Sequence, residues 1–140
     1  LKIWIKKRES ISQRYLELLS DVKGIELPQP SKLKKRRHSW NQFVIKIKIN
    51  DQYLARFAPL SPRDWLKKSL EELGVSTIIY YPIPIHLQPA YKDKLSSQIH
   101  LPVTEEICGD VLSLPIFPEI TAEEQYYVVS SIKQIIEKLV

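Results

Sequence analysis

His86 is the residue of this chain whose surroundings best suit a functional role. It closes the segment Tyr80-Tyr81-Pro82-Ile83-Pro84-Ile85-His86. The two prolines fix φ, so the imidazole would lose little conformational entropy on meeting a ligand. A rigid loop at the end of a strand is a frequent place for binding residues. The same position also suits a structural histidine that caps a helix or binds a buried carbonyl, and the segment alone favours neither interpretation.

The other reactive side chains favour structural roles. Cys108 lies on a predicted amphipathic helix with no base beside it, so we expect a small buried hydrophobe. Glu105 and Glu106 are expected to be solvated helix carboxylates, and helix capping is expected for three other acids: Asp64, Glu123 and Glu124. One cysteine and three scattered histidines lack the spacing of a zinc site. We find no catalytic triad, no carboxylate pair and no glycine-rich phosphate loop, and therefore predict no catalytic, metal or cofactor-binding residue from spacing.

Length and composition predict one domain over residues 1–140. The chain is 44% hydrophobic and 26% charged, which is typical of a folded globular protein. No apolar run is long enough for a membrane helix, and residues 1–7 are too short an apolar stretch for a signal peptide. We therefore expect no membrane partner and a cytoplasmic protein.

The positive charge is concentrated in the first half. Residues 1–70 hold 17 Lys and Arg against 6 Asp and Glu, whereas residues 71–140 hold 4 against 10. The densest run covers residues 32–37 and is followed by His38. Such a run could neutralise nucleic-acid phosphates. Since no DNA- or RNA-binding motif accompanies it, we expect a solvated loop and no nucleic-acid partner.

The first half of the chain predicts a helix followed by a strand. Apolar residues at Ile11, Tyr15, Leu18 and Val22 predict a helix over residues 1–22, with Gly24 as its stop. The alternation over residues 43–49 predicts a half-buried strand whose odd-numbered side chains face the core. Residues 52–59 are expected to form a loop.

The second half predicts alternating helices and strands. Ser61-Pro62-Arg63-Asp64 should begin a helix that buries Leu66, Leu70 and Leu73 and ends at Gly74. Residues 75–81 are expected to form a strand, and residues 82–90 a rigid loop. A short helix is predicted over residues 102–111, with Ile107 and Val111 on its inner face, and a strand over residues 112–116. Thr121 should cap the last helix, whose buried face is Val128, Ile132, Ile135 and Leu139.

This order of elements predicts an α/β (α+β) domain. A sheet of about three strands with helices mainly on one face suffices to bury a core of this size.

An ordered set of motifs resembles one family. Three segments are similar, in this order, to the C-terminal signatures of DegT/DnrJ/StrS-type sugar aminotransferases: Tyr81-Pro82-Ile83-Pro84-Ile85-His86, Pro102-Val103-Thr104-Glu105, and Leu112-Ser113-Leu114-Pro115-Ile116-Phe117-Pro118 with Thr121. Further matching elements lie outside them: Trp4, Arg8, Tyr15-Leu16, His38-Ser39-Trp40 and Arg63-Asp64. The resemblance covers nearly the whole chain. Residues 52–59 and the basic run depart from it.

The resemblance implies a fold and an incomplete enzyme. Members resemble fold type I pyridoxal-phosphate enzymes, in which a large N-terminal domain carries the cofactor and a small C-terminal domain closes over the substrate. This chain resembles the small domain, with a mainly antiparallel three-stranded sheet, and residues 1–22 would lead in from the missing large domain. The Schiff-base lysine segment belongs to that large domain. Pyridoxal phosphate is thus implied for the complete enzyme, and no cofactor is expected for this chain alone.

The resemblance also implies partners and substrate-binding residues. His86 would project towards a nucleotide-sugar substrate, and Tyr80 or Tyr81 would line the same mouth. Leu114 and Pro115 would form a turn near the domain interface. The implied reaction is transamination of a nucleotide-linked keto sugar by glutamate or glutamine, in a homodimer that makes sugars for cell-surface polysaccharides or antibiotics.

Two hypotheses follow from these expectations. The chain is either the C-terminal part of such an aminotransferase, inactive alone, or a free-standing binding or regulatory module derived from that domain. In the first case Trp4 and its helix would expose apolar surface and promote self-association.

Overall fold

A small antiparallel sheet lies at the centre of the computed structural model, which describes residues 1–29, 37–49, 58–91 and 99–138. The strands are β1 (Ile25–Glu26), β2 (Phe43–Ile47) and β3 (Val111–Leu114). β2 is the middle strand, and it pairs antiparallel with both neighbours. Phe43 lies opposite Leu114, and Ile45 lies opposite Leu112. The register therefore places four core side chains on one face of the sheet.

β2 has one buried face and one polar face. The side chains of Phe43, Ile45 and Ile47 are buried, whereas Val44 and Lys46 are only partly covered. This confirms the expectation that the odd positions face the core, because successive side chains of a strand point to opposite faces.

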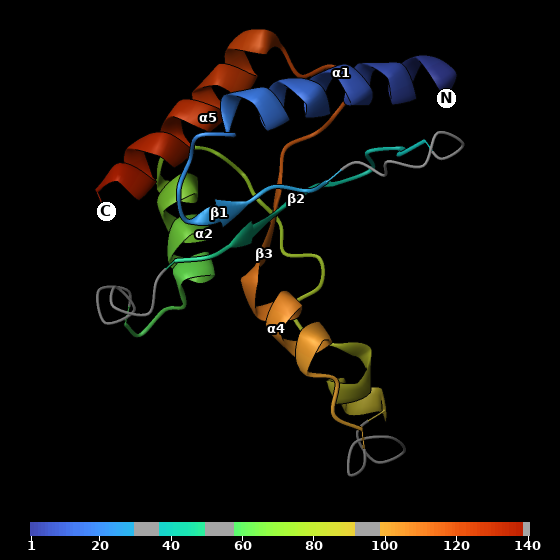
Figure 1. Cartoon of the computed structure of the whole chain (residues 1–140), viewed down its shortest axis with the longest axis vertical. Helices are drawn as coiled ribbons and strands as arrows, with labels where there is room; N and C mark the ends of the chain where they lie inside the picture. The colour runs from blue at the N-terminus through green and yellow to red at the C-terminus, as the bar shows by residue number, and fades with distance from the viewer. Residues whose placement is uncertain (30–36, 50–57, 92–98, 139–140) are drawn as a thin grey trace.

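Three helices share the core with the buried face of the sheet. They are α1 (Lys2–Leu18), α2 (Pro62–Glu72) and α5 (Ala122–Glu137). α1 and α5 lie side by side above the sheet, and α2 packs against α5 (Figure 1). Their buried residues join those of the sheet in one cluster, which includes Ile11, Tyr15, Leu66, Leu70, Val128 and Ile132. The predicted class, a three-stranded antiparallel sheet with helices mainly on one face, is confirmed.

The predicted helix caps are present. The Ser61 hydroxyl accepts a hydrogen bond from the Asp64 backbone N–H at 3.1 Å, and Gly74 follows α2 with φ of +75°. At α5, the Thr121 hydroxyl accepts from the Glu124 N–H at 3.1 Å, and the Glu124 carboxylate accepts from the Thr121 N–H at 2.7 Å. These local signals work because each cap satisfies backbone groups that a helix end leaves free.

α1 ends at Leu18, four residues earlier than the sequence predicted. The Ser20 hydroxyl donates to the Glu17 carbonyl at 2.8 Å, a local bond that competes with continuation of the helix. The chain then turns through Gly24, whose φ is +85° and whose carbonyl accepts from the Lys48 N–H at 2.8 Å. Gly24 therefore leads into β1 rather than ending the helix.

The strand predicted over residues 75–81 is wrong. Only Ile78 pairs with the sheet, through two backbone hydrogen bonds with Ser113 of 2.8 and 3.2 Å. The third strand is instead β1, which contains only two residues. Pro82 and Pro84 cannot donate to a ladder, so the chain leaves the sheet as it approaches them.

The remaining elements form what we call the arm, residues 82–91 and 99–110. It contains the 3₁₀ turn η2 (Ile85–Leu87) and α4 (Pro102–Asp110), and it extends away from the helices and the sheet (Figure 1). α4 occupies the predicted range but has no buried residue. Ile107, expected on its inner face, is 41% exposed, and Val111 is buried as the first residue of β3.

Some expectations fall outside the described residues: residues 32–36, residues 52–57 and Leu139. Within the part of the chain that the structure describes, no helix is both long and apolar enough to cross a membrane.

Candidate functional site

His86 lies in the η2 turn and points to α4. Its side chain is almost fully buried, and its Nε2 lies 3.0 Å from Oε1 of Glu105. The same carboxylate oxygen accepts from the Leu101 N–H at 3.0 Å and lies 3.3 Å from Nδ1 of His100. Glu105 is therefore not the solvated carboxylate that the sequence predicted. The Glu105 carboxylate connects η2, the turn that contains His86, to the first turn of α4.

The environment of Glu105 favours its charged form. The hydrogen bond from the Leu101 backbone is the main cause that lowers the pKa of its carboxyl group, and the His86 hydrogen bond lowers it further. Hydrogen bonds to a carboxylate stabilise the ionised state. At neutral pH this side chain is thus an acceptor only.

Tyr80 and Tyr81 lie before the arm and are open to solvent. Their ring centroids are 5.8 Å apart in an edge-to-face arrangement, and Tyr81 is the more exposed of the two, at 68%. Tyr80 lines a pocket of about 330 Å³ together with Asn41, Gln42 and Ser113. The polar groups of these four side chains are hydroxyls and amides, which can both donate to and accept from the hydroxyl groups of a ligand.

One hydroxyl at this pocket is left without a partner. Ser113 Oγ is buried and makes no hydrogen bond within the described residues. Unpaired buried hydroxyls are costly in folded proteins.

Lys46 on β2 and Lys48, which follows the strand, hold α4 against the polar face of the sheet. Lys46 and Lys48 place their Nζ atoms 2.9 and 2.8 Å from Oε1 of Glu106, and both lie within 4 Å of Asp110. The lysines lower the pKa of Glu106 to about 2, and the same contact raises the pKa of Lys48. We call these four residues the lysine clamp. The sequence signal for it was the alternation that put both lysines on one face of the strand.

Arg63 also binds the carboxyl-terminal half of α4. Its Nη1 donates to the Cys108 carbonyl at 2.6 Å, while its Nε donates to Asp64 at 3.0 Å. Cys108 itself is partly buried, less than expected for a core residue. An arginine at the carboxyl end of a helix satisfies a free carbonyl and opposes the helix dipole. Asp64 therefore both caps α2 and orients Arg63.

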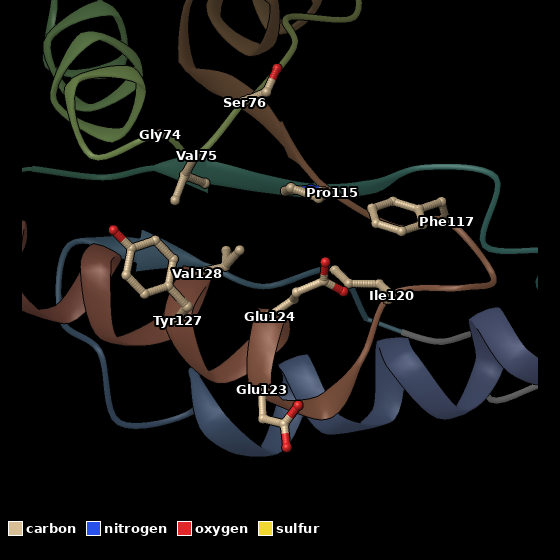
Figure 2. A pocket seen from close by; sticks show the side chains of 10 residues that line it. All are labelled: Gly74, Val75, Ser76, Pro115, Phe117, Ile120, Glu123, Glu124, Tyr127 and Val128. Carbon is tan, nitrogen blue, oxygen red and sulfur yellow. The ribbon is translucent and has the colours of Figure 1, made fainter.

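A second, larger pocket lies between the segment after α2, the helix α5 and the segment after β3. It has a volume of about 640 Å³, and Phe117, Ile120, Tyr127 and Val128 give it an apolar lining (Figure 2). His86 and Tyr81 do not line it. Pro115 lies at its edge and also lines the pocket beside Tyr80.

Leu114 and Pro115, which were predicted to form a turn, are instead the last residue of β3 and the residue that follows it, and both are tied to the core. Leu114 is buried, and the Pro115 carbonyl accepts a hydrogen bond of 3.0 Å from the Tyr15 hydroxyl. Burial raises the pKa of that hydroxyl, so it remains a donor. Pro115 therefore connects the core to both pockets.

Lys48 is not suited to form a Schiff base. A catalytic lysine needs a lowered pKa, whereas the pKa of Lys48 is raised by its carboxylate partner. No group of three or more His, Cys, Asp or Glu within the described ranges could hold a metal ion. We therefore derive no chemical step on a cofactor from these residues.

Arg37, the described residue of the basic run, and the residues that follow it contact other parts of the chain. Arg37 pairs with Glu9 at 2.6 Å, and the His38 ring packs on Trp40 at a centroid distance of 4.2 Å. The Arg8 side chain donates to the Ser39 carbonyl. This segment is therefore fastened to α1.

Known proteins resemble this chain in sequence and in fold. The sequence model described as the DegT/DnrJ/EryC1/StrS aminotransferase family matches residues 1–133. The erythromycin biosynthesis sensory transduction protein EryC1 of Saccharopolyspora erythraea is 35% identical over 130 residues, which are 93% of this chain and 31% of that protein. A dTDP-3-amino-3,4,6-trideoxy-alpha-D-glucose transaminase of Streptomyces venezuelae is 27% identical over 99% of this chain and 33% of its own length.

A solved relative extends the resemblance to three dimensions. The crystal structure of NtdA from Bacillus subtilis with bound cofactor PMP superposes with a TM-score of 0.75 at 32% identity, over 98% of this chain and 29% of that one. The chain therefore spans about a third of the length of the relatives it matches.

Proposed function

Because the chain belongs to the DegT/DnrJ/EryC1/StrS aminotransferase family, we propose that it is the C-terminal domain of a pyridoxal-phosphate-dependent aminotransferase that acts on nucleotide-linked keto sugars. In this proposal it closes the substrate side of the active site and is inactive alone. A large N-terminal domain supplies the cofactor and its lysine. The proposal is supported by the transaminase relatives and by their threefold greater length.

The observation that carries this proposal is the exposure of the arm. α4 has no buried residue, and apolar side chains on the arm are more than 40% exposed, among them Ile83, Ile85, Leu101, Val103 and Ile107. Exposed apolar surface of this extent indicates a contact with another domain or protein. In the proposed enzyme the arm would exclude water from the substrate once the large domain is present.

Each of the expected substrate-binding residues receives a role that follows from its geometry. Tyr81 is the most exposed of the three, so we assign it a direct hydrogen bond to the substrate. Tyr80 would line the pocket for the sugar, whose hydroxyls match the neutral lining. His86 has one ring nitrogen left after Nε2 meets Glu105, so it would make a single contact.

The start of α1 fits the proposed connection to a large domain. Leu1, Ile3 and Trp4 are each more than half exposed, and they lie at the end of the helix that would lead in. We place the complete enzyme in the cytoplasm as a homodimer, which makes sugars for cell-surface polysaccharides or antibiotics. Without the large domain, the same apolar surface should drive self-association, which sedimentation measures.

The first test is the intact mass of the native gene product in its source cells, detected with an antibody to this domain. The proposal expects a band much heavier than the 16.4 kDa of this chain. The purified native protein should then transfer the amino group of glutamate or glutamine to a dTDP- or UDP-linked keto sugar. The 140-residue chain alone should not.

A tyrosine pair tests the assignment of the substrate side. In the complete enzyme, Tyr81→Phe should raise the KM for the keto sugar about fivefold to tenfold, the cost of one hydrogen bond. Tyr126→Phe is the matched control, since Tyr126 on α5 is similarly exposed and lies off the arm. Equal kinetics of both variants would contradict the role of Tyr81.

A second candidate is a free-standing regulatory module derived from this domain. The name of one relative, a sensory transduction protein, favours it. A native band near 16.4 kDa together with absence of transamination would replace the first proposal by this one.

A further inference from the structure

The hydrogen bond between His86 and Glu105 determines what the imidazole can offer to a ligand. Nε2 lies 3.0 Å from a carboxylate oxygen. An ionised carboxylate has no proton to donate, so Nε2 must carry the hydrogen of this bond. In the neutral ring the other nitrogen, Nδ1, then holds a lone pair and is an acceptor.

We infer that Glu105 is the positioning residue of His86, and that it fixes the imidazole as an Nε2–H tautomer whose Nδ1 accepts a hydrogen bond from a hydroxyl or amino group of the substrate. The first half of this inference stands on the described contacts alone. The second half rests on the proposed function.

The carboxylate of Glu105 is held independently of His86. Oε1 accepts from the Leu101 backbone N–H at 3.0 Å, within the first turn of α4, and His100 Nδ1 lies 3.3 Å away. His100 is largely exposed, whereas His86 is almost fully buried. Glu105 therefore has an anchor other than His86, as a positioning residue must have.

The free nitrogen sets the class of group that His86 recognises. No hydrogen bond joins Nδ1 to any described residue, so Nδ1 is the ring nitrogen that the inference assigns to the ligand. A neutral acceptor pairs with a donor and repels the lone pairs of a phosphate oxygen. The inference therefore assigns His86 to a hydroxyl or amino group on the sugar and not to the diphosphate.

Nitrogen NMR of the 140-residue chain tests the first half directly. The chain is labelled with ¹⁵N-histidine and measured at pH 8, where long-range ¹H–¹⁵N spectra separate the two ring nitrogens. We expect His86 as a single Nε2–H tautomer with a slowly exchanging ring proton. A protonated Nδ1 in the unmodified chain overturns the inference, and this result needs no variant.

Two variants of adjacent carboxylates make the assignment specific. In Glu105→Ala, the ¹⁵N chemical shifts of both His86 ring nitrogens should move to the averaged values of a mixture of tautomers. The slowly exchanging ring proton should be lost. Glu106→Gln is the control for a weakened α4, because Glu106 binds Lys46 and Lys48 and the variant leaves the Glu105 carboxylate in place. A His86 spectrum that is the same in Glu105→Ala and the unmodified chain overturns the role of Glu105.

Two substitutions of the histidine separate positioning from binding. In His86→Gln the side-chain nitrogen replaces Nε2 and can still donate to Glu105, while the group at Nδ1 is lost. In His86→Asn the side-chain amide lies near the Nδ1 position and is too short to reach Glu105. His86→Gln should therefore preserve the α4 amide shifts, and His86→Asn should change them.

Kinetics of the complete enzyme test the second half. His86→Gln should raise the KM for the keto sugar about tenfold with little change in kcat, as expected when one hydrogen bond to the substrate is removed. An unchanged KM overturns the assignment of Nδ1 to the substrate. Absence of transamination in the native protein would refute the proposed function, while the NMR result would still decide the role of Glu105.

Discussion

The core and the arm are held in place by different forces. In the core, α1, α2 and α5 bury apolar side chains against the odd face of β2. In the arm, α4 buries none and is held by the lysine clamp, by Arg63 and by the pair of His86 and Glu105. Apolar burial is strong and insensitive to pH, whereas exposed ion pairs are weak and screened by salt.

This difference suits the two regions to different tasks. A core must stay folded under all conditions, and its energy scales with the apolar area removed from water. An element that faces a substrate and another domain needs a defined position but an open surface. A few polar contacts at the two ends of α4 provide the position and leave its apolar side chains exposed.

Removal of a core aromatic ring should have the largest effect. Phe43 is fully buried, and its ring centroid lies 5.0 Å from that of Tyr15 and 5.8 Å from that of Trp40. We expect Phe43→Ala to lower the free energy of unfolding by about 3–5 kcal/mol, as measured by urea denaturation. The control in the arm, Ile85→Ala, should change it by less than about 0.5 kcal/mol, since Ile85 is exposed. A similar loss in both variants would remove the distinction between the regions.

A buried amide should give the next largest effect. Gln125 is fully buried on α5; its Nε2 donates to the Ile11 carbonyl at 3.0 Å, and its Oε1 accepts from Arg14 at 2.6 Å. Gln125→Leu leaves the carbonyl and the guanidinium without this partner, so we expect a loss of about 1–3 kcal/mol. Calorimetry of this variant beside Gln13→Leu, whose side chain is exposed, measures the contribution of burial. Equal melting temperatures would mean that the amide is dispensable.

Acid should release the arm while the core stays folded. The folded pKa of Glu106, about 2, lies below the ordinary value of 4.5, so its contribution is present above pH 4.5 and is lost as the pH falls towards 2. Amide chemical shifts of α4 should therefore change in this range before those of α5 and β2. High salt should produce the same order of release at neutral pH.

Glu106→Gln tests the cause of this release. The variant should show weakened α4 contacts already at neutral pH and a smaller change on acidification. If the amide shifts of α4 and α5 change over the same pH range in the unmodified chain, the arm unfolds together with the core. The two regions would then not be held by different forces.

Much of the core could be predicted from the sequence. The alternation of β2, the Ser61 and Thr121 caps and the left-handed Gly74 are local features, each set by a few neighbouring residues. The predicted strand over residues 75–81 failed for the opposite reason. Its β-branched and aromatic residues are typical of a strand, but pairing requires a neighbour over its whole length, and β3 offers one only at Ile78.

The arm could be predicted only in part. Periodicity indicated the helix over residues 102–111, and the proline-rich segment singled out His86. Glu105 was interpreted as a solvated carboxylate because its partner is 19 residues away in the sequence. The Arg63 contact with the Cys108 carbonyl spans 45 residues and was equally invisible. No local pattern signals such pairs.

The sequence by itself thus determined the core face, the helix caps and the motifs that resemble the family, because burial patterns and caps act over a few residues. Only the tertiary structure decided that His86 meets Glu105, that β1 completes the sheet and that α4 rests on a lysine clamp. These contacts join segments far apart in the chain, and their geometry depends on where the whole backbone places each side chain. The candidate site is therefore a property of the folded chain, built on elements whose local sequence already indicated them.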